Sequence, residues 1–247
     1  MKVALVTGGS RGLGGGISKA LGAAGWIVAV NYAHNKGPAE EVVSEIERNG
    51  GRAIAVRFDV TDDEEVRTGL GAIAQKVGPV DLIVNNATAP QMFIKIEDQT
   101  WEDHLDQLRF FVKAPLSLLR AVLPDWRRRR TGRVINLGSE CFDIGNPNFA
   151  HYVGAKGAML GVTRSWAREL GPEGITVNLV EPGWISVQVE RQATTTSSEV
   201  DEYRSCVPLG KMGRPEDIGA MVVFLASPQA DFITGQAFAV NGGRTLS

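Results

Sequence analysis

The sequence predicts one doubly wound α/β domain, in which a seven-stranded parallel sheet carries helices on both faces. Short apolar segments rich in β-branched residues recur along the 247 residues, and longer segments with helical periodicity separate them. Short apolar strands separated by helices are typical of a parallel sheet that is covered on both faces. No linker, composition break or internal repeat divides the chain, so we expect residues 1–247 to form a single domain.

The predicted elements alternate along the chain. Strands are expected over Val3–Thr7, Ile27–Tyr32, Ala53–Asp59, Leu82–Asn85, Arg133–Leu137, Thr176–Glu181 and Ala237–Val240. Helices are expected over Gly15–Ala24, Pro38–Asn49, Asp63–Lys76, Thr100–Trp126, Tyr152–Leu170 and Pro215–Ala226. The polar, aperiodic segment Thr194–Glu199 indicates a loop, and we expect a substrate loop over about residues 187–210; a plain surface loop is the alternative.

Composition and charge argue against several classes of protein. A net charge of −2 gives no reason to expect nucleic acid or a membrane as the partner. Cys141 and Cys206 have no metal or disulfide spacing, so no metal site is expected. The apolar start Val3–Val6 is too short for an export signal, which predicts a cytoplasmic protein. The basic run Arg127–Arg130 is typical of a solvated helix end; an anion site is the alternative.

A glycine-rich turn lies between the first predicted strand and the first predicted helix. It reads Thr7-Gly8-Gly9-Ser10-Arg11-Gly12-Leu13-Gly14. Small residues in this position let backbone N–H groups approach a pyrophosphate, and the helix N-terminus then faces the anion. The turn therefore predicts a Rossmann-type nucleotide site, with an incidental turn as the alternative.

The end of the second predicted strand bears on which dinucleotide is used. An NAD site places a carboxylate there for the ribose 2′-hydroxyl, but the segment Asn31-Tyr32-Ala33-His34 has no acid before Glu40. Arg11 could bind a 2′-phosphate, with help from Lys36 or His34. We expect NADP(H) rather than NAD(H); a solvent-facing role for Arg11 is the alternative.

Tyr152 and Lys156 begin the predicted helix that follows the fifth strand. Their four-residue offset puts both side chains on one helix face, and Ser139 lies just past that strand. An ammonium about 4 Å from a phenol, at an effective dielectric of about 20, contributes on the order of 4 kcal/mol. We therefore expect Lys156 to lower the pKa of Tyr152 by about three units, into the range useful for proton transfer.

These motifs, in this order, resemble the short-chain dehydrogenase/reductase family over nearly the whole chain, and in particular its branch of 3-oxoacyl-carrier-protein-reductase-like proteins. The family's glycine turn reads Thr-Gly-x-x-x-Gly-x-Gly. Further matching segments are Asp59-Val60, Asn85-Asn86-Ala87, Pro182-Gly183, Gly213-Arg214-Pro215-Glu216-Asp217, Thr234-Gly235 and Asn241-Gly242-Gly243.

The resemblance implies roles for individual residues. Ser139 would hold the substrate oxygen, Tyr152 would exchange the alcohol proton, and Lys156 would also bind the nicotinamide ribose. The cofactor-binding residues implied are Gly8, Ser10, Arg11, Gly12, Leu13, Gly14, Asn31, His34, Asp59, Val60, Asn86, Ala87, Tyr152, Lys156, Pro182, Gly183 and Ile185. The family also implies a homotetramer or a dimer.

Three positions depart from the family pattern. Thr88 and Val187 stand where glycine and threonine are usual. The family's asparagine, which organises a water beside the lysine, falls on Phe111 or on Leu108, depending on the direction of counting. Neither side chain can hydrogen-bond, so Gln107 or His104 is a candidate substitute.

The predicted function is an NADP(H)-dependent ketoreductase or alcohol dehydrogenase. Two alternatives remain: a cofactor-using epimerase or dehydratase on the same fold, and an NADP-binding regulatory protein with low turnover. We expect the substrate, a small carbonyl or alcohol compound, to contact Gln91, Glu140, Cys141, Phe149 and Trp184. The aromatic residues favour an apolar or ring-containing substrate, or else they are loop anchors.

Overall fold

A computed structural model describes residues 1–186 and 196–246, and its centre is one seven-stranded sheet. All strand pairs in the sheet are parallel. In sheet order the strands are β3 (Arg52–Arg57), β2 (Ile27–Tyr32), β1 (Val3–Val6), β4 (Val80–Asn85), β5 (Gly132–Leu137), β6 (Ile175–Pro182) and β7 (Ala237–Val240). Each strand coincides with a predicted segment to within a few residues, so the predicted sheet is confirmed.

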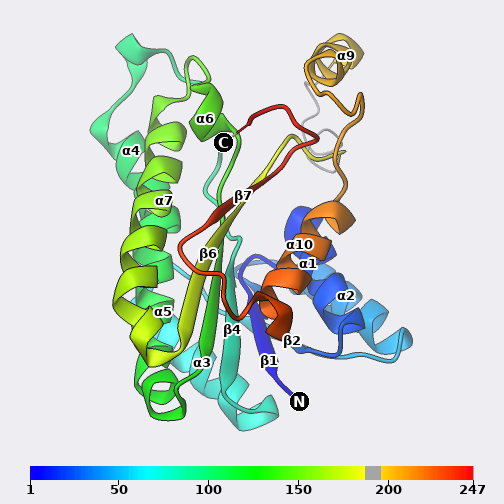
Figure 1. Ribbon diagram of the computed structural model, residues 1–247, viewed down its shortest axis with the longest axis vertical. Helices are drawn as coiled ribbons and strands as arrows, with labels where there is room; N and C mark the ends of the chain where they lie inside the picture. The colour runs from blue at the N-terminus through cyan, green and yellow to red at the C-terminus, as the bar shows by residue number, and fades with distance from the viewer. Residues whose placement is uncertain (187–195, 247) are drawn as a thin grey trace.

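Helices cover both faces of the sheet (Figure 1). One face carries α1 (Gly12–Ala23), α2 (Lys36–Arg48) and α10 (Pro215–Ala226). The other face carries α3 (Asp63–Val77), α4 (Trp101–Leu108), α5 (Ala114–Arg129) and α7 (Ala150–Leu170). The predicted Rossmann-type doubly wound fold is therefore confirmed.

Two of the three apolar clusters in the described residues lie on opposite faces of the sheet and hold these layers together. Successive side chains of a strand point to opposite faces. In β1, Val3 and Leu5 accordingly join the core under α3, α5 and α7, whereas Ala4 and Val6 join the core under α1, α2 and α10. Because all four residues of β1 are buried, this central strand is apolar throughout instead of alternating.

The strand order reverses beside β1, since β2 and β3 lie on one side of it and β4 to β7 on the other. In open α/β sheets, ligands bind beyond the carboxyl ends of the strands at such a switch point. The glycine turn follows β1, and Asn86-Ala87 follows β4. The topology therefore brings both predicted cofactor segments to the same edge of the sheet.

Three helical segments differ from the predictions. The long helix expected over Thr100–Trp126 is divided into α4 and α5 by a π-helical turn, Arg109–Lys113. A short helix, α6 (Cys141–Ile144), follows β5 and was not predicted. The loop expected over residues 187–210 contains a helix, α9 (Ser197–Ser205), so that part of the prediction is wrong; Val187 and Thr194 lie outside the described residues.

The sequence does contain a signal for the start of α9. The Thr196 hydroxyl accepts a hydrogen bond from the Glu199 backbone, and the Glu199 carboxylate accepts one from the Thr196 backbone. This reciprocal arrangement is a capping box, which stabilises a helix start by pairing N–H groups that have no partner within the helix. The weak periodicity of the following residues concealed it.

The basic run at the end of α5 is engaged within the protein. Arg127 pairs with Glu173, Arg128 with Asp125, and Arg129 with both Asp125 and Asp81. Arg130 donates to the backbone carbonyl of Pro172. Because each guanidinium already has a partner, the structure favours the helix-end interpretation over an anion site.

Candidate active site

The glycine turn is fastened to the end of β4 through Thr7. The Thr7 hydroxyl accepts hydrogen bonds from the backbone amides of Asn86 (2.9 Å) and Ala87 (3.0 Å) and donates to the carbonyl of Val84 (3.2 Å). The Asn86 side chain donates to the carbonyls of Thr7 (2.9 Å) and Gly8 (3.2 Å). The two predicted cofactor segments therefore form one rigid unit at the switch point.

The turn needs glycine at two positions for different reasons. Gly12 has a φ of +55°, in the left-handed region that other residues rarely adopt. A Cβ at Gly14 would lie 2.3 Å from the Gly8 carbonyl oxygen, which is far inside contact distance. Asn31 supports the turn from β2, because its Oδ1 accepts from the Gly8 amide (3.1 Å) and its Nδ2 donates to Phe58 (2.9 Å). Both polar groups of Asn31 are thus used within the protein.

The start of α1 fits the pyrophosphate of a dinucleotide. No side chain caps this helix and no acid lies in its first turn, whereas Asp62 caps α3 and Thr100 caps α4. The N–H groups of a helix start carry partial positive charge and attract anions. Ser10 and Leu13 flank this start, and the exposed Arg11 adds a full positive charge beside it.

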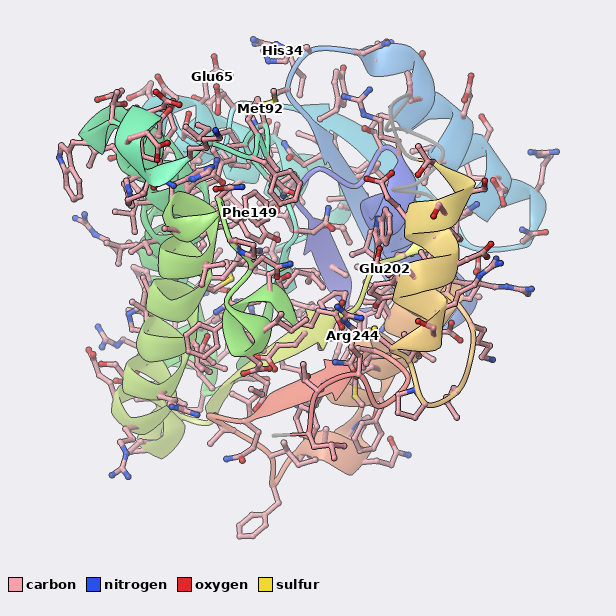
Figure 2. All side chains as sticks on the ribbon, turned by 90° about the horizontal axis from the view of Figure 1, so that it is seen from above. His34, Glu65, Met92, Phe149, Glu202 and Arg244 are labelled. Atoms are coloured by element: carbon pink, nitrogen blue, oxygen red, sulfur yellow. The ribbon has the colours of Figure 1, made fainter. Side chains whose placement is uncertain are left out.

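The adenosine end of the predicted site lies beyond β2 and β3. The Asp59 carboxylate accepts hydrogen bonds from the backbone and hydroxyl of Thr61, each at 2.8 Å, and Val60 is buried. His34 stands at the exposed bend after β2 (Figure 2). The segment between Asn31 and Asn35 carries no carboxylate that would repel a 2′-phosphate.

The opposite end of the crevice is formed by the segment after β6. Pro182 ends that strand, and the Gly183 amide donates to the Val240 carbonyl (3.2 Å) in the neighbouring β7. Ile185 forms an isolated parallel bridge with Gly213. These contacts place the predicted nicotinamide segment beside the carboxyl end of β6.

The structure brings Ser139, Tyr152 and Lys156 together, each buried by at least nine-tenths. The Ser139 hydroxyl lies close enough to the Tyr152 hydroxyl to lower the pKa of that phenol in part. Ser139 Oγ also accepts from the Cys141 amide (3.2 Å). Lys156 Nζ donates to the Leu137 carbonyl (2.6 Å) at the end of β5 and lies 5.4 Å from the centre of the Tyr152 ring. The predicted trio therefore meets at one point beyond β5.

Burial dominates the protonation of this pair. It raises the pKa of Tyr152, although the Ser139 hydroxyl lowers it in part. Burial also lowers the pKa of Lys156 to about 7, which leaves much of the amine neutral near physiological pH. The expected shift of Tyr152 by a fully charged neighbour is therefore wrong for the protein alone, because the same burial that exposes Tyr152 to that charge also discharges Lys156.

Phe111, in the π-helical turn, occupies the space beside Lys156. Its ring centre lies 3.6 Å from Lys156 Nζ, and the ring meets Tyr152 edge-on at 5.5 Å. Of the two positions that could correspond to the family's asparagine, Phe111 is the one that the structure places against the lysine. Neither candidate substitute bonds to Lys156 in the described part of the chain: Gln107 Nε2 donates to the Pro90 carbonyl (2.9 Å), and His104 pairs with Gln99. An aromatic ring thus packs against the amine, and it forms a cation–π contact when Lys156 is protonated.

Three of the five predicted substrate contacts surround Ser139 and Tyr152. Phe149 stacks on the Tyr152 ring at 4.5 Å, and the exposed Phe93 stacks on Phe149 at 4.6 Å, so that a column of stacked aromatic rings leads from the surface to Tyr152. Cys141 is half-buried next to Ser139, and burial raises the pKa of its thiol, which argues against a nucleophile. Glu140 is buried and turns its carboxylate inward.

The other two predicted substrate contacts belong to the loops after β4 and β6. Gln91 donates to the Thr88 hydroxyl (2.8 Å) in the loop after β4. Trp184 meets the ring of Tyr203 edge-on at 5.4 Å. Tyr203 belongs to α9, and its proximity to the site was missed because α9 itself was not predicted.

Two hollows of about 370 and 390 Å³ open on the α1 and α10 side and share Ser186 and Arg214. The first is bordered by Arg11 and Gly12, but neither contains a member of the trio. They therefore adjoin the glycine turn and do not mark the reacting centre.

A family model described as enoyl-(acyl carrier protein) reductase matches residues 8–245. The chain is 40% identical over 245 residues to the 3-oxoacyl-[acyl-carrier-protein] reductase FabG of Staphylococcus aureus, covering 98% of this chain and 97% of the relative. The chain belongs to the short-chain dehydrogenase/reductase family. Similar family members are the 3-oxoacyl-[acyl-carrier-protein] reductases of Synechocystis (36% identical; 99% of this chain, 97% of the relative) and Pseudomonas aeruginosa (36%; 100% and 98%).

Membership of the short-chain dehydrogenase/reductase family confirms the predicted activity class. The protein is an NADP(H)-dependent oxidoreductase that acts on a carbonyl/alcohol pair. Beside the reacting trio this chain places the Phe111 ring next to Lys156 and the buried side chain of Glu140 after Ser139.

Proposed function

We propose that this protein reduces the 3-oxo group of an acyl thioester carried on acyl carrier protein, using NADPH and a reaction centre formed by Ser139, Tyr152 and Lys156. The convergence of these three side chains beyond β5 is the observation that carries the proposal. The relatives that match the whole chain are named for this substrate. The aromatic column from Phe93 to Tyr152 gives an apolar route along which an acyl chain could pack.

Each member of the trio has a distinct task in this proposal. The bound cofactor supplies the hydride. Ser139 donates a hydrogen bond to the substrate carbonyl oxygen, which positions it beside Tyr152. Tyr152 then gives its phenolic proton to that oxygen, for which its raised pKa in the free protein keeps the proton in place. Lys156 returns a proton toward Tyr152 and, held by Phe111 and the Leu137 carbonyl, binds the nicotinamide ribose.

The cofactor would lie along the edge from β3 to β6. The start of α1 would hold the pyrophosphate, with Gly8, Ser10, Gly12, Leu13 and Gly14 near it. The adenine would contact Asp59 and Val60. The neighbouring ribose would lie against Asn86 and Ala87, and the nicotinamide would contact Pro182, Gly183 and Ile185. Arg11 and His34 would receive the 2′-phosphate.

Replacing Arg11 should separate the two nicotinamide cofactors. We expect Arg11→Ala to raise the dissociation constant of NADPH by about 30-fold and that of NADH by less than threefold. Only NADPH carries the 2′-phosphate that a guanidinium binds. Dissociation constants from fluorescence titration measure both. Arg48→Ala, at the exposed end of α2, is the matched control and should change neither. Equal losses for NADPH and NADH would contradict the assignment.

A substrate series tests the proposed function itself. Purified protein should oxidise NADPH with a 3-oxoacyl thioester, on the carrier protein or on a pantetheine mimic, faster than with small ketones. The decrease in nicotinamide absorbance measures the rate. NADPH binding without turnover on any carbonyl compound would instead support a regulatory protein, and product at an unchanged redox level would support an epimerase or dehydratase.

Assembly and location are part of the same proposal. Large apolar side chains are exposed on α5 (Leu116), on α10 (Phe224) and before β7 (Phe232), which favours a homotetramer built through these faces, or a dimer through one of them. In the described part of the chain, no helix is long and apolar enough to cross a bilayer. A cytoplasmic location fits this proposal, and light scattering of the purified protein tests the assembly.

A further inference from the structure

A buried polar cluster joins the catalytic serine loop to α9 and to the C-terminal segment. Its members are Glu140, directly after Ser139; Tyr203 of α9; and Arg244, after β7. Glu140 and Tyr203 are both buried by at least nine-tenths. Figure 2 shows Arg244 beside α9, which carries the exposed Glu202. None of the three belongs to the glycine turn or to the trio.

The Tyr203 hydroxyl forms two hydrogen bonds in this cluster. It donates to Glu140 Oε1 (2.9 Å) and accepts from the backbone amide of Trp184 (2.7 Å). It therefore connects the loop after β5, which carries Ser139, to the loop after β6, which carries Gly183. A Cβ at Gly183 would lie 2.6 Å from the same hydroxyl, so the contact depends on that glycine.

Arg244 closes the cluster from the other side. Its guanidinium carbon lies 4.6 Å from the centre of the Tyr203 ring, and its Nε lies 3.6 Å from Glu140 Oε1. Burial raises the pKa of Glu140, and the hydrogen bond from Tyr203 and the charge of Arg244 oppose that rise. Burying a carboxylate is costly unless hydrogen bonds and an opposite charge compensate it. Glu140 is therefore stable in this position only while α9 and the C-terminal segment stay packed against it.

Backbone hydrogen bonds connect the segment that carries Ser139 to β6. The Gly138 amide donates to Val180 (2.7 Å) and the Glu140 amide to Pro182 (3.2 Å), so the peptide units on both sides of Ser139 are fixed to β6. The Tyr203 hydroxyl adds a side-chain link from α9 to both loops. We propose that Tyr203 and Glu140 are positioning residues, which set Ser139 and the nicotinamide segment relative to each other when α9 is packed. This rests on the proposed role of Ser139.

Tyr203→Phe tests this inference, because it removes the hydroxyl and keeps the ring against Trp184 and Arg244. We expect kcat to fall by about tenfold, the effect of losing one hydrogen bond to a charged group. KM for the carbonyl substrate and the NADPH dissociation constant should change less than threefold. Glu140→Gln keeps an acceptor for Tyr203 and should lower kcat less than Glu140→Ala does. Glu140→Ala should lower kcat by the same factor as Tyr203→Phe. The double variant Tyr203→Phe/Glu140→Ala should lower kcat no further than either single variant.

Amide hydrogen exchange gives a readout that needs no turnover. In Tyr203→Phe, peptides covering residues 138–145 and 183–186 should exchange faster than in the unaltered protein, whereas the matched control Glu202→Gln on the exposed side of α9 should not alter them. Faster exchange confined to α9, or an unchanged kcat in the folded variant, would overturn the inference and leave Tyr203 a local packing residue. If the unaltered protein reduces no 3-oxoacyl thioester, the proposed substrate is wrong. The hydrogen-exchange experiment still tests whether Tyr203 positions the two loops.

Discussion

Tyr152→Phe should lower kcat by at least about a thousandfold, because it removes the only proton that the proposed centre can give to the substrate oxygen. The NADPH dissociation constant should stay within threefold, since the glycine turn and Arg11 are untouched. The fold should also be unaffected. The Tyr152 ring is held between Phe149 and Phe111, and its hydroxyl contacts Ser139, so phenylalanine keeps the aromatic packing.

The measurement combines steady-state rates with a cofactor titration on the same protein. Ser139→Ala is the companion variant and should lower kcat by about 10- to 100-fold, because it removes positioning and leaves the proton donor. Turnover of Tyr152→Phe within tenfold of the unaltered protein would show that another group, such as Cys141, delivers the proton. A large loss of NADPH affinity would instead show that the ring shapes the cofactor site.

The sheet could be predicted almost completely from the sequence, for a physical reason. Strands such as β1 and β4 are buried on both faces, so β1 is wholly apolar and β4 has a continuous apolar run, Leu82–Val84, which stands out from the neighbouring segments. The glycine turn could also be predicted from the sequence, because the positive φ at Gly12 and the lack of space for a Cβ at Gly14 leave room for few other residues. Features set by local sterics and burial are therefore visible in the residues themselves.

Features set by contacts between distant segments were not predictable in the same way. The break between α4 and α5 leaves the hydrophobic periodicity nearly intact, so nothing in the pattern marks the π-helical turn. Glu140 was expected at the substrate, because its partners Tyr203 and Arg244 lie far along the chain. The protonation of Lys156 was misjudged since the degree of burial, unlike the spacing to Tyr152, is not contained in the sequence.

Lys156→Met should abolish turnover and yet stabilise the fold at pH 7. In the unfolded chain the amine holds its proton up to about pH 10.5, whereas the folded protein releases it from about pH 7. Between these values the unfolded state binds more protons, so the free energy of unfolding rises with pH and is lowest below pH 7. At pH 7 the buried lysine therefore costs about 4 kcal/mol of stability. Methionine removes that cost but leaves the Leu137 carbonyl without its donor, which costs about 1–3 kcal/mol.

We therefore expect Lys156→Met to be about 1–3 kcal/mol more stable than the unaltered protein at pH 7. The difference in free energy of unfolding between the variant and the unaltered protein should fall by about 3 kcal/mol when urea unfolding is repeated at pH 9.5. At that pH most of the stability cost of the buried lysine has disappeared. Lys76→Met, exposed on α3, is the matched control and should show no pH-dependent difference. A stability difference that stays constant from pH 7 to pH 9.5 would mean that Lys156 keeps its proton in the folded protein. The cation–π contact with Phe111 would then outweigh burial, and the amine would face Tyr152 as a full positive charge.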